Sequence, residues 1–280
     1  SEVVWEIPAS FKQGMRVPAR VYGTEKLVSE MEGGVFEQVT NVACLPGIRK
    51  YAYAMADAHL GYGWPIGGVA GFSLGEGVIS PGGIGFDINC GMKLIRTDLS
   101  FREVKPKTKE LVDLLFQTVP AGVGVKGFLH VNQRQFEDIM VQGVRWCVEN
   151  GYGWKEDLQR TEDNGCVKGA DPSKVSRMAM QRGIDQQGTL GSGNHYLELQ
   201  VVDPKRFFDL ELAKHFGITM EDQVTVMIHT GSRGFGHQIA TDYLKVFDGA
   251  MRKYGITVRD RELACAPFNS PEGQNYYKAM

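Results

Sequence analysis

Two side chains with ligand chemistry stand three residues apart in the segment from Ser80 to Thr97, which reads SPGGIGFDINCGMKLIRT. Asp87 supplies a carboxylate and Cys90 a thiolate, and one turn of this length can aim both at a single point. The four glycines of the segment let the backbone adopt positive φ angles or approach a ligand closely. A hard oxygen donor beside a soft sulfur donor is typical of a metal site. The alternative is a tight turn before a buried strand, with Cys90 as a small core residue.

Imidazole groups stand at two later junctions between a glycine-rich turn and an expected strand. Asn194 and His195 follow the turn in Gly188–Val202, and His229 ends the apolar run that begins at Gln223. Three junctions of this kind in one chain, each flanked by glycine, favour a metal site. A thiolate with imidazoles would by ligand softness indicate Zn²⁺, whereas the spacing itself supports only a divalent metal.

The segment after His195 alternates apolar and polar side chains, as a strand does. The period of two places His195 and Leu197 on one face and Asn194, Tyr196 and Glu198 on the other.

Asp57 and His59 alternate with apolar neighbours at another expected strand end, so their side chains face the same side. A histidine in such a place is more often structural. The aspartate two residues before it and the glycine-rich turn after it favour a role in supporting metal ligands rather than binding the ion directly.

Arg233 lies in the turn HTGSRGFGH, between the strand that ends at His229 and a helix expected from Gln238 to Tyr254. Backbone N–H groups at a helix N-terminus and a guanidinium fork together form a ready site for an anion such as phosphate.

Hydrophobic patterning predicts mixed strands and helices, an α+β fold in which glycine-rich turns surround a metal cleft. We expect a strand and turn over Val39–Gly47 and an irregular polar segment over 151–170. Helices are expected over Thr24–Met31, Lys105–Val119 (buried), Asn132–Asn150 (with Cys147 on its apolar face), Asp171–Arg182 and Pro204–Phe216.

Composition narrows the class of protein. The chain has 280 residues, with 31 Lys and Arg against 33 Asp and Glu, so a nucleic acid would have to be held by a local patch. Five scattered cysteines argue for a reducing compartment without a disulfide framework. Because residues 1–12 do not resemble a signal peptide and no apolar run is long enough for a membrane helix, we expect a cytoplasmic protein without a membrane partner.

Several segments together resemble one family. SPGGIGFDINCG, GTLGSGNHYLE and HTGSRGFGH look like the signature segments of the RtcB family of tRNA-splicing and RNA-repair ligases, and DAHLGYG and NSPEGQ match as well. The resemblance covers nearly the whole chain in the family's order. It implies an RtcB-like fold and a ligase that joins RNA 3′-phosphate or 2′,3′-cyclic phosphate ends to 5′-hydroxyl ends.

The resemblance also implies cofactors and a ligand set. The family uses GTP and two Mn²⁺ ions and passes through a histidine–guanylate. By matching position, Asp87, Cys90 and His195 would hold one Mn²⁺, and Cys90 would bridge to a second ion that His229 also binds. The Mn²⁺ assignment comes from the resemblance, against the preference for Zn²⁺ noted above.

The remaining site residues follow in the same way. The guanylate site would be lined by Asn194, His195, Tyr196, Leu197 and Glu198, with Glu198 on the guanine edge. Arg182 and Arg233 match arginines of the RNA phosphate channel, and Asp57 matches an acidic residue near the site. The implied partners are RNA, as tRNA exon halves or broken ends, and a protein activator of the archease type.

The chain departs from the family's pattern in its length. We expect residues 1–280 to form a single RtcB-like catalytic domain without the family's C-terminal segment, which carries a further metal histidine and the histidine that is guanylylated. No histidine of this chain stands in that context, so no catalytic residue is assigned. Two alternatives stay open: a dinuclear metallohydrolase, and a metal-dependent RNA-binding fragment without turnover.

Overall fold

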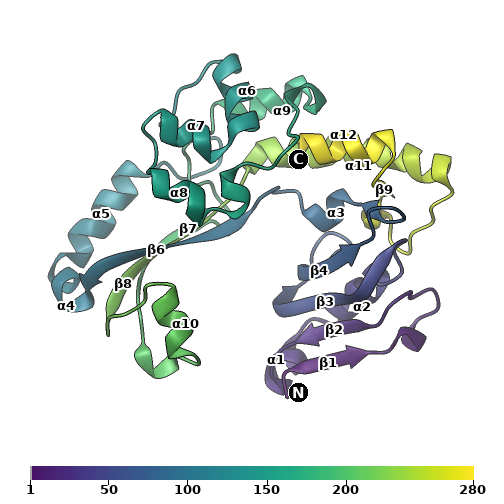
Figure 1. Cartoon of the computed structure of the whole chain (residues 1–280), viewed down its shortest axis with the longest axis horizontal. Coiled ribbons are helices and arrows are strands. Elements are labelled where there is room, and N and C mark those ends of the chain that lie inside the picture. Colours follow the sequence, from purple (N-terminus) through teal and green to yellow (C-terminus); the bar gives the residue numbers. More distant parts are fainter. Residues whose placement is uncertain (1) are drawn as a thin grey trace. The chain divides into compact units, whose positions relative to one another are not determined.

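Helices and strands are mixed along the whole chain in the computed structural model, which describes residues 2–280 (Figure 1). The chain forms two compact units. The first contains the chain up to Ile88 together with Glu137–Ala179 and Gly236–Met280, and the second contains Asn89–Phe136 and Met180–Phe235. The mixed content confirms the α+β class. The expectation of a single catalytic domain stays a prediction.

The N-terminal part of the first unit is a four-stranded sheet in the order β1 (Val4–Ile7), β2 (Ala19–Tyr22), β3 (Ile48–His59) and β4 (Ile66–Phe72). The β2–β3 pair is parallel and the other two pairs are antiparallel. Parallel neighbours need a crossover connection, which α1 (Glu25–Glu30) and α2 (Gly33–Val42) supply. The Thr24 side chain caps α1 by accepting from the Leu27 N–H, as expected from the sequence.

Helix α2 corrects one prediction. The run Val39–Gly47 was expected as a strand and turn. It begins inside this helix, and none of its residues forms a strand. Val35, Val39 and Val42 are buried at helical spacing and share one core with Ala52 of β3. A short apolar run cannot by itself distinguish a buried strand from a buried helix, and here the period of the whole segment decides.

A second prediction fails at Gly143, where the helix expected over Asn132–Asn150 is broken into α6 (Gln133–Gln142) and α7 (Val144–Glu149). Gly143 has a φ of 57°, which other residues rarely adopt. A Cβ at this position would lie 2.0 Å from the Gly165 carbonyl oxygen. The break therefore depends on a close backbone approach that helical periodicity does not register. Cys147 is half-buried on α7.

Three further segments differ from expectation. The segment 151–170 is not wholly irregular, because it contains α8 (Lys155–Arg160) and the short 3₁₀ helix η3 (Glu162–Gly165). Asp171 caps a helix start as expected, but the helix is only η4 (Pro172–Lys174), and α9 (Arg177–Ile184) follows separately. The segment Pro204–Phe216 is likewise divided, into η5 (Pro204–Arg206) and α10 (Leu210–His215).

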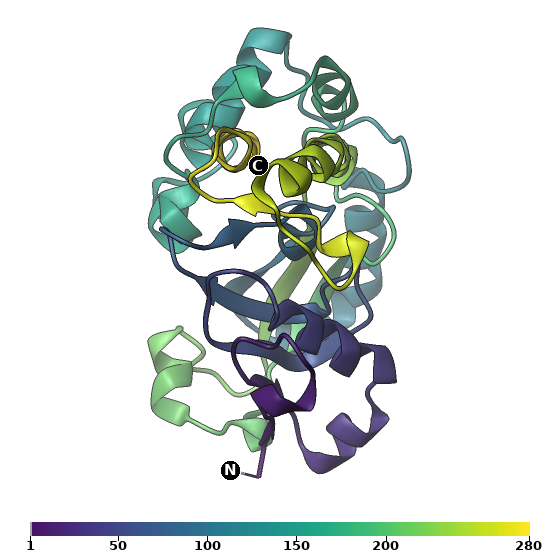
Figure 2. The same cartoon turned by 90° about the vertical axis from the view of Figure 1, so that its right-hand side faces the viewer.

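The C-terminal helices of the first unit pack through aromatic side chains. α12 (Pro271–Ala279) lies beside α11 (Arg233–Tyr254) in both views (Figures 1 and 2). The Tyr276 ring is fully buried, with its centroid 5.1 Å from that of Tyr243 and 5.5 Å from that of Phe247. The remaining elements of this unit are η1 (Ala9–Phe11), β5 (Val78–Ile79), α3 (Pro81–Ile84), η6 (Arg261–Leu263) and β9 (Ala266–Pro267).

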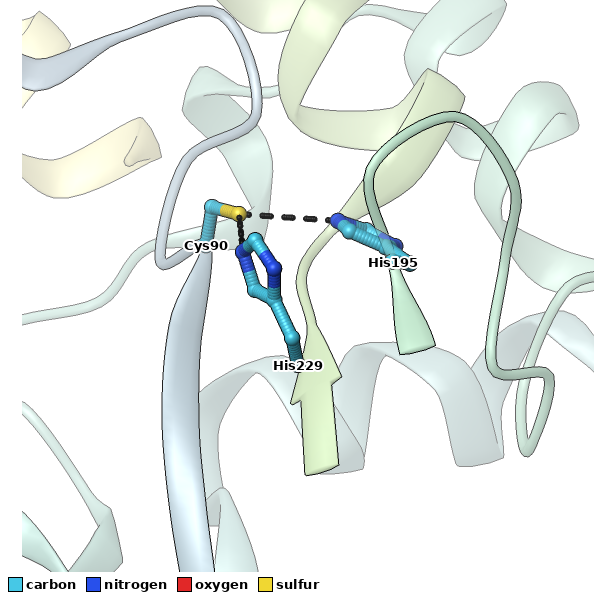
Figure 3. A group of neighbouring side chains, drawn as sticks. All are labelled: Cys90, His195 and His229. Carbon is cyan, nitrogen blue, oxygen red and sulfur yellow. Dashed lines mark hydrogen bonds between the residues drawn. The ribbon is translucent and has the colours of Figure 1, made fainter. Parts of the chain in front are cut away.

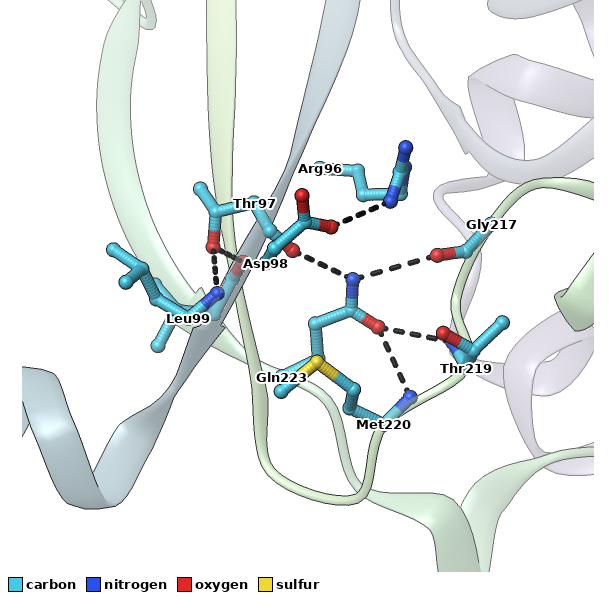
Figure 4. A network of polar contacts seen from close by, with 9 residues as sticks. Arg96, Thr97, Asp98, Leu99, Gly217, Thr219, Met220 and Gln223 are labelled. Carbon is cyan, nitrogen blue, oxygen red and sulfur yellow. Dashed lines mark hydrogen bonds and ion pairs between the residues drawn. The ribbon is translucent and has the colours of Figure 1, made fainter.

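The second unit is built on a three-stranded antiparallel sheet in the order β6 (Gly91–Ser100), β8 (Gln223–Thr230) and β7 (Tyr196–Val201). Gln223 begins the central strand and is fully buried. Its amide nitrogen donates to the Thr97 and Gly217 carbonyls, at 2.7 and 3.4 Å. Its amide oxygen accepts from the Thr219 and Met220 N–H groups, at 3.0 and 3.2 Å (Figure 4). One side chain thus ties the loop before β8 to β6.

The helices that follow β6 are more exposed than expected. They are α4 (Phe101–Val104), η2 (Lys105–Lys107) and α5 (Thr108–Thr118). The Lys105–Val119 segment is helical, but α5 contains no buried residue and Phe116 is 88% exposed, so the prediction of a buried helix is wrong. The helix expected from Gln238 starts earlier, as α11 at Arg233. None of the helices described over residues 2–280 is both long and apolar enough to cross a membrane.

Candidate metal centre

The sheet of the second unit brings Cys90, His195 and His229 to one of its ends. β8 runs antiparallel to both neighbours, so its C-terminal end lies beside the N-terminal ends of β6 and β7. Cys90 directly precedes β6, and His195 directly precedes β7, whose first residue Tyr196 pairs with His229. Three residues that are far apart in sequence therefore meet because antiparallel pairing places opposite strand ends side by side.

The ligand atoms of these three residues face one another (Figure 3). Cys90 Sγ lies 3.0 Å from His229 Nε2 and 3.5 Å from His195 Nε2, and the three ligand atoms lie within 4.8 Å of one another. Zinc ligands stand roughly 2.0–2.3 Å from the ion, so two ligands of one ion are separated by about 3–4 Å. The spacing and the donor set therefore fit a bound divalent metal.

A backbone carbonyl on the side of the His195 ring away from Cys90 fixes the orientation of the ring. Its Nδ1 lies 3.0 Å from the Leu190 carbonyl oxygen, and because a carbonyl only accepts, Nδ1 must carry the proton. In the neutral ring Nε2 then carries a lone pair, and this is the nitrogen that faces Cys90. A metal-binding histidine is commonly held in this way by a bond to its other nitrogen.

The three residues are partly exposed to solvent. Cys90 is exposed, and both histidines are half-buried. The Tyr196 ring stands edge-on to His229, with centroids 5.3 Å apart. An ion or a phosphate oxygen can thus reach the sulfur, while packing restricts the imidazoles.

Asp87, the first of the predicted ligands, belongs to the first unit, whereas the three converging residues belong to the second. It is half-buried in the segment between α3 and β6. Its role as a ligand stays a prediction.

Cys90, His195 and His229 are called the metal group below. The residues predicted to bind guanylate begin at this group and continue along β7. Asn194 is exposed in the turn before the strand. By register, Tyr196 stands opposite His229 and Glu198 opposite Met227, so Tyr196 and Glu198 share the sheet face of His229, whereas Leu197 points to the other face. The exposed Glu198 carboxylate accepts from the Gln200 amide at 2.9 Å.

The two predicted RNA-binding arginines both belong to the second unit. Arg182 is exposed on α9, and a Cβ at Gly234 would lie 3.7 Å from a side-chain carbon of Arg182, so the two positions adjoin at the start of α11. Arg233 is half-buried, and its guanidinium donates to the Ser192 carbonyl at 3.0 Å and also to the Ser192 hydroxyl.

Asp57 and His59 lie at the end of β3 in the first unit, as expected, and both are exposed. The His59 ring donates from Nδ1 to the Asp57 carbonyl at 2.9 Å. Their proposed support of metal ligands stays a prediction.

Three groups around these residues were not expected from the sequence: the Leu190 carbonyl, the Thr230 hydroxyl and Ser192. The Thr230 hydroxyl donates to the Leu190 carbonyl at 2.8 Å. A backbone carbonyl has no sequence signature, and a threonine directly after His229 was the only available hint.

Comparison with known proteins places these observations in a family. A family model described as tRNA-splicing ligase RtcB matches residues 38–280. The tRNA-splicing ligase RtcB of Archaeoglobus fulgidus is 55% identical over 276 residues, which are 99% of this chain and 57% of that protein. The protein of the same name from Thermococcus kodakarensis is 54% identical over 280 residues, or 100% of this chain and 57% of that protein.

A more divergent relative, the tRNA-splicing ligase RtcB of Nanoarchaeum equitans, is 50% identical over 278 residues, or 99% of this chain and 57% of that protein. The chain thus spans somewhat more than half the length of these curated relatives.

Proposed function

Because the chain belongs to the RtcB family of tRNA-splicing ligases, we propose that it forms the metal- and nucleotide-binding part of a GTP- and Mn²⁺-dependent RNA ligase. The reaction joins an RNA 3′-phosphate or 2′,3′-cyclic phosphate end to a 5′-hydroxyl end, through a histidine–guanylate, in tRNA splicing and RNA repair. The observation that carries the proposal is the convergence of Cys90, His195 and His229 within 4.8 Å.

These three residues would hold the metal ions, with Asp87 as a further ligand. The ions supply charge neutralisation at phosphate oxygens and alignment of the reacting groups. The chain's own contribution is to present one thiolate and two oriented imidazoles on a sheet end, where antiparallel pairing fixes their spacing. Ligand softness favours Zn²⁺ for this donor set and the family favours Mn²⁺, so both ions belong in the test.

Glu198 would recognise guanine. A carboxylate can accept from the guanine N1–H and 2-amino groups, and adenine offers neither donor at that edge. The exposed position of Glu198 on the same sheet face as His229 supports this role. A nucleotide whose base reached Glu198 would run along β7 with its phosphates toward the metal residues.

Arg182 and Arg233 would hold RNA phosphates near the start of α11, where guanidinium groups and helix N–H groups both favour anions. The proposal also includes a cytoplasmic location and an activator of the archease type. The cytoplasmic location is expected from the scattered spacing of the five cysteines, which is typical of proteins in a reducing compartment.

The test measures binding by the chain itself. Titrations with Mn²⁺ and Zn²⁺ compare the wild type with Cys90→Ala, and nucleotide titrations compare Glu198→Gln with Glu221→Gln, an exposed carboxylate of the same unit. We expect Cys90→Ala to abolish tight metal binding. We expect Glu198→Gln to weaken GTP but not ATP, and Glu221→Gln to change neither. Equal loss of GTP and ATP in Glu198→Gln would remove this residue from base recognition.

RNA with 3′-phosphate and 5′-hydroxyl ends, added to a form of the protein long enough to carry the histidine that is guanylylated in the family, separates the ligase from its rivals. GTP-dependent joining supports the ligase. Release of inorganic phosphate without GTP would favour the metallohydrolase, since metal clusters of this kind also activate water. RNA binding with neither reaction would favour the RNA-binding fragment.

A further inference from the structure

The end of β8 carries two consecutive residues that bear on the candidate metal group. His229 is one of the candidate ligands, and Thr230, the next residue, donates its hydroxyl to the Leu190 carbonyl at 2.8 Å. The same carbonyl oxygen accepts the Nδ1–H of His195 at 3.0 Å. We propose that Thr230 is a positioning residue: its hydroxyl fixes the Leu190 carbonyl, and that carbonyl fixes the His195 ring with Nε2 toward Cys90. The inference rests on the metal site proposed above.

The Leu190 carbonyl lies in a loop that contains several glycines with positive φ. Gly188, Gly191 and Gly193 have φ angles of 82°, 103° and 75°, and glycine gives the backbone freedom to leave such conformations. The Leu190 N–H donates to the Pro120 carbonyl at 2.9 Å. This bond holds the nitrogen of Leu190, and the Gly122 N–H donates to the carbonyl of the next residue, Gly191, at 2.7 Å. Between these two bonds, the Leu190 carbonyl itself accepts from Thr230.

One carbonyl oxygen can serve both donors, because it has two lone pairs. The Thr230 hydroxyl and the His195 N–H therefore do not compete. They cooperate, since a carbonyl held in place by the first donor offers a fixed acceptor to the second.

The consequence for metal binding is a choice of tautomer. With Nδ1–H bonded to Leu190, the neutral His195 ring presents a lone pair on Nε2, the atom 3.5 Å from Cys90 Sγ. If the carbonyl turns away, the ring can rotate or place its proton on Nε2, and a protonated nitrogen cannot bind a metal. Loss of such an outer partner commonly weakens metal affinity by roughly 10–100-fold.

The first measurement is a titration with Co²⁺, whose thiolate charge-transfer absorption reports binding at Cys90. Thr230→Val keeps the shape of the side chain and removes the donor, and Thr230→Ser restores the hydroxyl. Thr97→Val is the matched control, because the Thr97 hydroxyl also donates to a backbone carbonyl, that of Val224, toward the other end of the same sheet. We expect a lower affinity in Thr230→Val, by up to about 10–100-fold, the loss that follows when a metal-binding histidine loses its outer partner, with Thr230→Ser and Thr97→Val near the wild type.

The second measurement needs no metal. Long-range ¹⁵N correlation spectra at one fixed pH identify the tautomer of His195, whose signal is the one missing from His195→Gln. We expect the Nδ1–H tautomer in the wild type and in Thr230→Ser, and a mixture of tautomers in Thr230→Val.

Two results would overturn the inference: a Thr230→Val protein with wild-type Co²⁺ affinity and an unchanged tautomer, or an equal loss of affinity in Thr97→Val. A wild type that binds no Co²⁺ would instead count against the metal site itself. The tautomer comparison would then still decide whether Thr230 positions His195.

Discussion

Arg233 donates from its guanidinium to both the carbonyl and the hydroxyl of Ser192, 41 residues earlier in the chain. Ser192 lies in the glycine-rich loop that ends at His195. The backbone of Arg233 has a φ of 58°, in the left-handed region that non-glycine residues seldom occupy. The side-chain contacts therefore hold a strained residue at the start of α11. An arginine predicted to meet RNA phosphate therefore also contacts the loop that carries His195, a candidate metal ligand.

Arg233→Lys separates these two tasks. Lysine keeps the positive charge but lacks the planar fork that reaches both Ser192 oxygens. We expect metal affinity to fall several-fold while the salt dependence of RNA binding keeps its slope, because the number of charges is unchanged. The measurements are metal titration and RNA binding at several salt concentrations.

Arg182→Lys is the control for that experiment. Arg182 is exposed, and its substitution by lysine preserves the charge in the same way at a nearby position. It should leave metal affinity as in the wild type. Full metal affinity in Arg233→Lys would show that the contact with Ser192 does not support the metal group.

Gly191→Ala should disrupt the metal group directly. A Cβ at Gly191 would lie 2.6 Å from His195 Nδ1 and 2.6 Å from the Arg233 side chain, so it would displace both side chains. Gly193→Ala is the matched change, since Gly193 also has a positive φ but no atom would lie within 4 Å of its Cβ.

We expect Gly193→Ala to lose about 1–2 kcal/mol of stability through backbone strain, and Gly191→Ala to lose more because its Cβ would also clash with two side chains. Only Gly191→Ala should also lose metal affinity. Thermal denaturation and metal titration read the two effects separately, and equal metal affinity in the two variants would contradict the proposed geometry.

Gln223→Met should destabilise the second unit. Methionine fills the same volume but leaves two carbonyls and two N–H groups without the partner they have in the wild type. Buried polar groups that lose a partner cost about 1–3 kcal/mol each before relaxation, so we expect a total loss of about 2–4 kcal/mol after water and backbone adjust.

Chemical denaturation measures that loss, with Gln117→Met on the exposed side of α5 as the control. The control should change stability by less than about 0.5 kcal/mol. A Gln223→Met protein as stable as the control would mean that the loop before β8 does not depend on this side chain.

The convergence of three candidate metal ligands could be predicted because the chemistry of these residues and their local context coincide. Cys90, His195 and His229 each stand where a strand begins or ends beside glycines, and antiparallel pairing then brings those strand ends together. Alternation was less reliable for His195, which lies before the first paired residue of β7. The alternation of a strand therefore does not constrain the His195 side chain. Alternation predicted His195 on the face opposite to Tyr196, whereas the His195 ring lies near His229, the residue that pairs with Tyr196.

The features that sequence could not supply depend on backbone groups and on neighbours distant in the chain. Gly143 ends α6 because Gly165 approaches it, a contact that no helical pattern contains. The Leu190 carbonyl orients His195, although any residue at position 190 would have offered the same oxygen. The sequence predicted Gln223 only as the first residue of a strand. Its side-chain hydrogen bonds to four backbone groups depend on the fold.

The cysteines should differ in their reactivity toward alkylating agents. The thiolate is the species that reacts with alkylating agents, so exposure and pKa together set the order. Cys90 is exposed and should react first. Burial raises the pKa of the Cys265 thiol to about 12, and its side chain is fully buried, so it should react last. Burial also raises the pKa of the Cys44 and Cys147 thiols, which should be intermediate.

A bound metal should slow the alkylation of Cys90, because a sulfur that coordinates a metal is less available to react with the reagent. We expect Zn²⁺ or Mn²⁺ to slow iodoacetamide modification of Cys90 at least tenfold while the half-exposed Cys166 reacts at its metal-free rate, as read by peptide mass spectrometry. His195→Ala should remove the protection, whereas His215→Ala, at the end of α10, should retain it. Protection that survives in His195→Ala would show that the ion is held at Cys90 without this imidazole, and the three-residue group would not be the metal site.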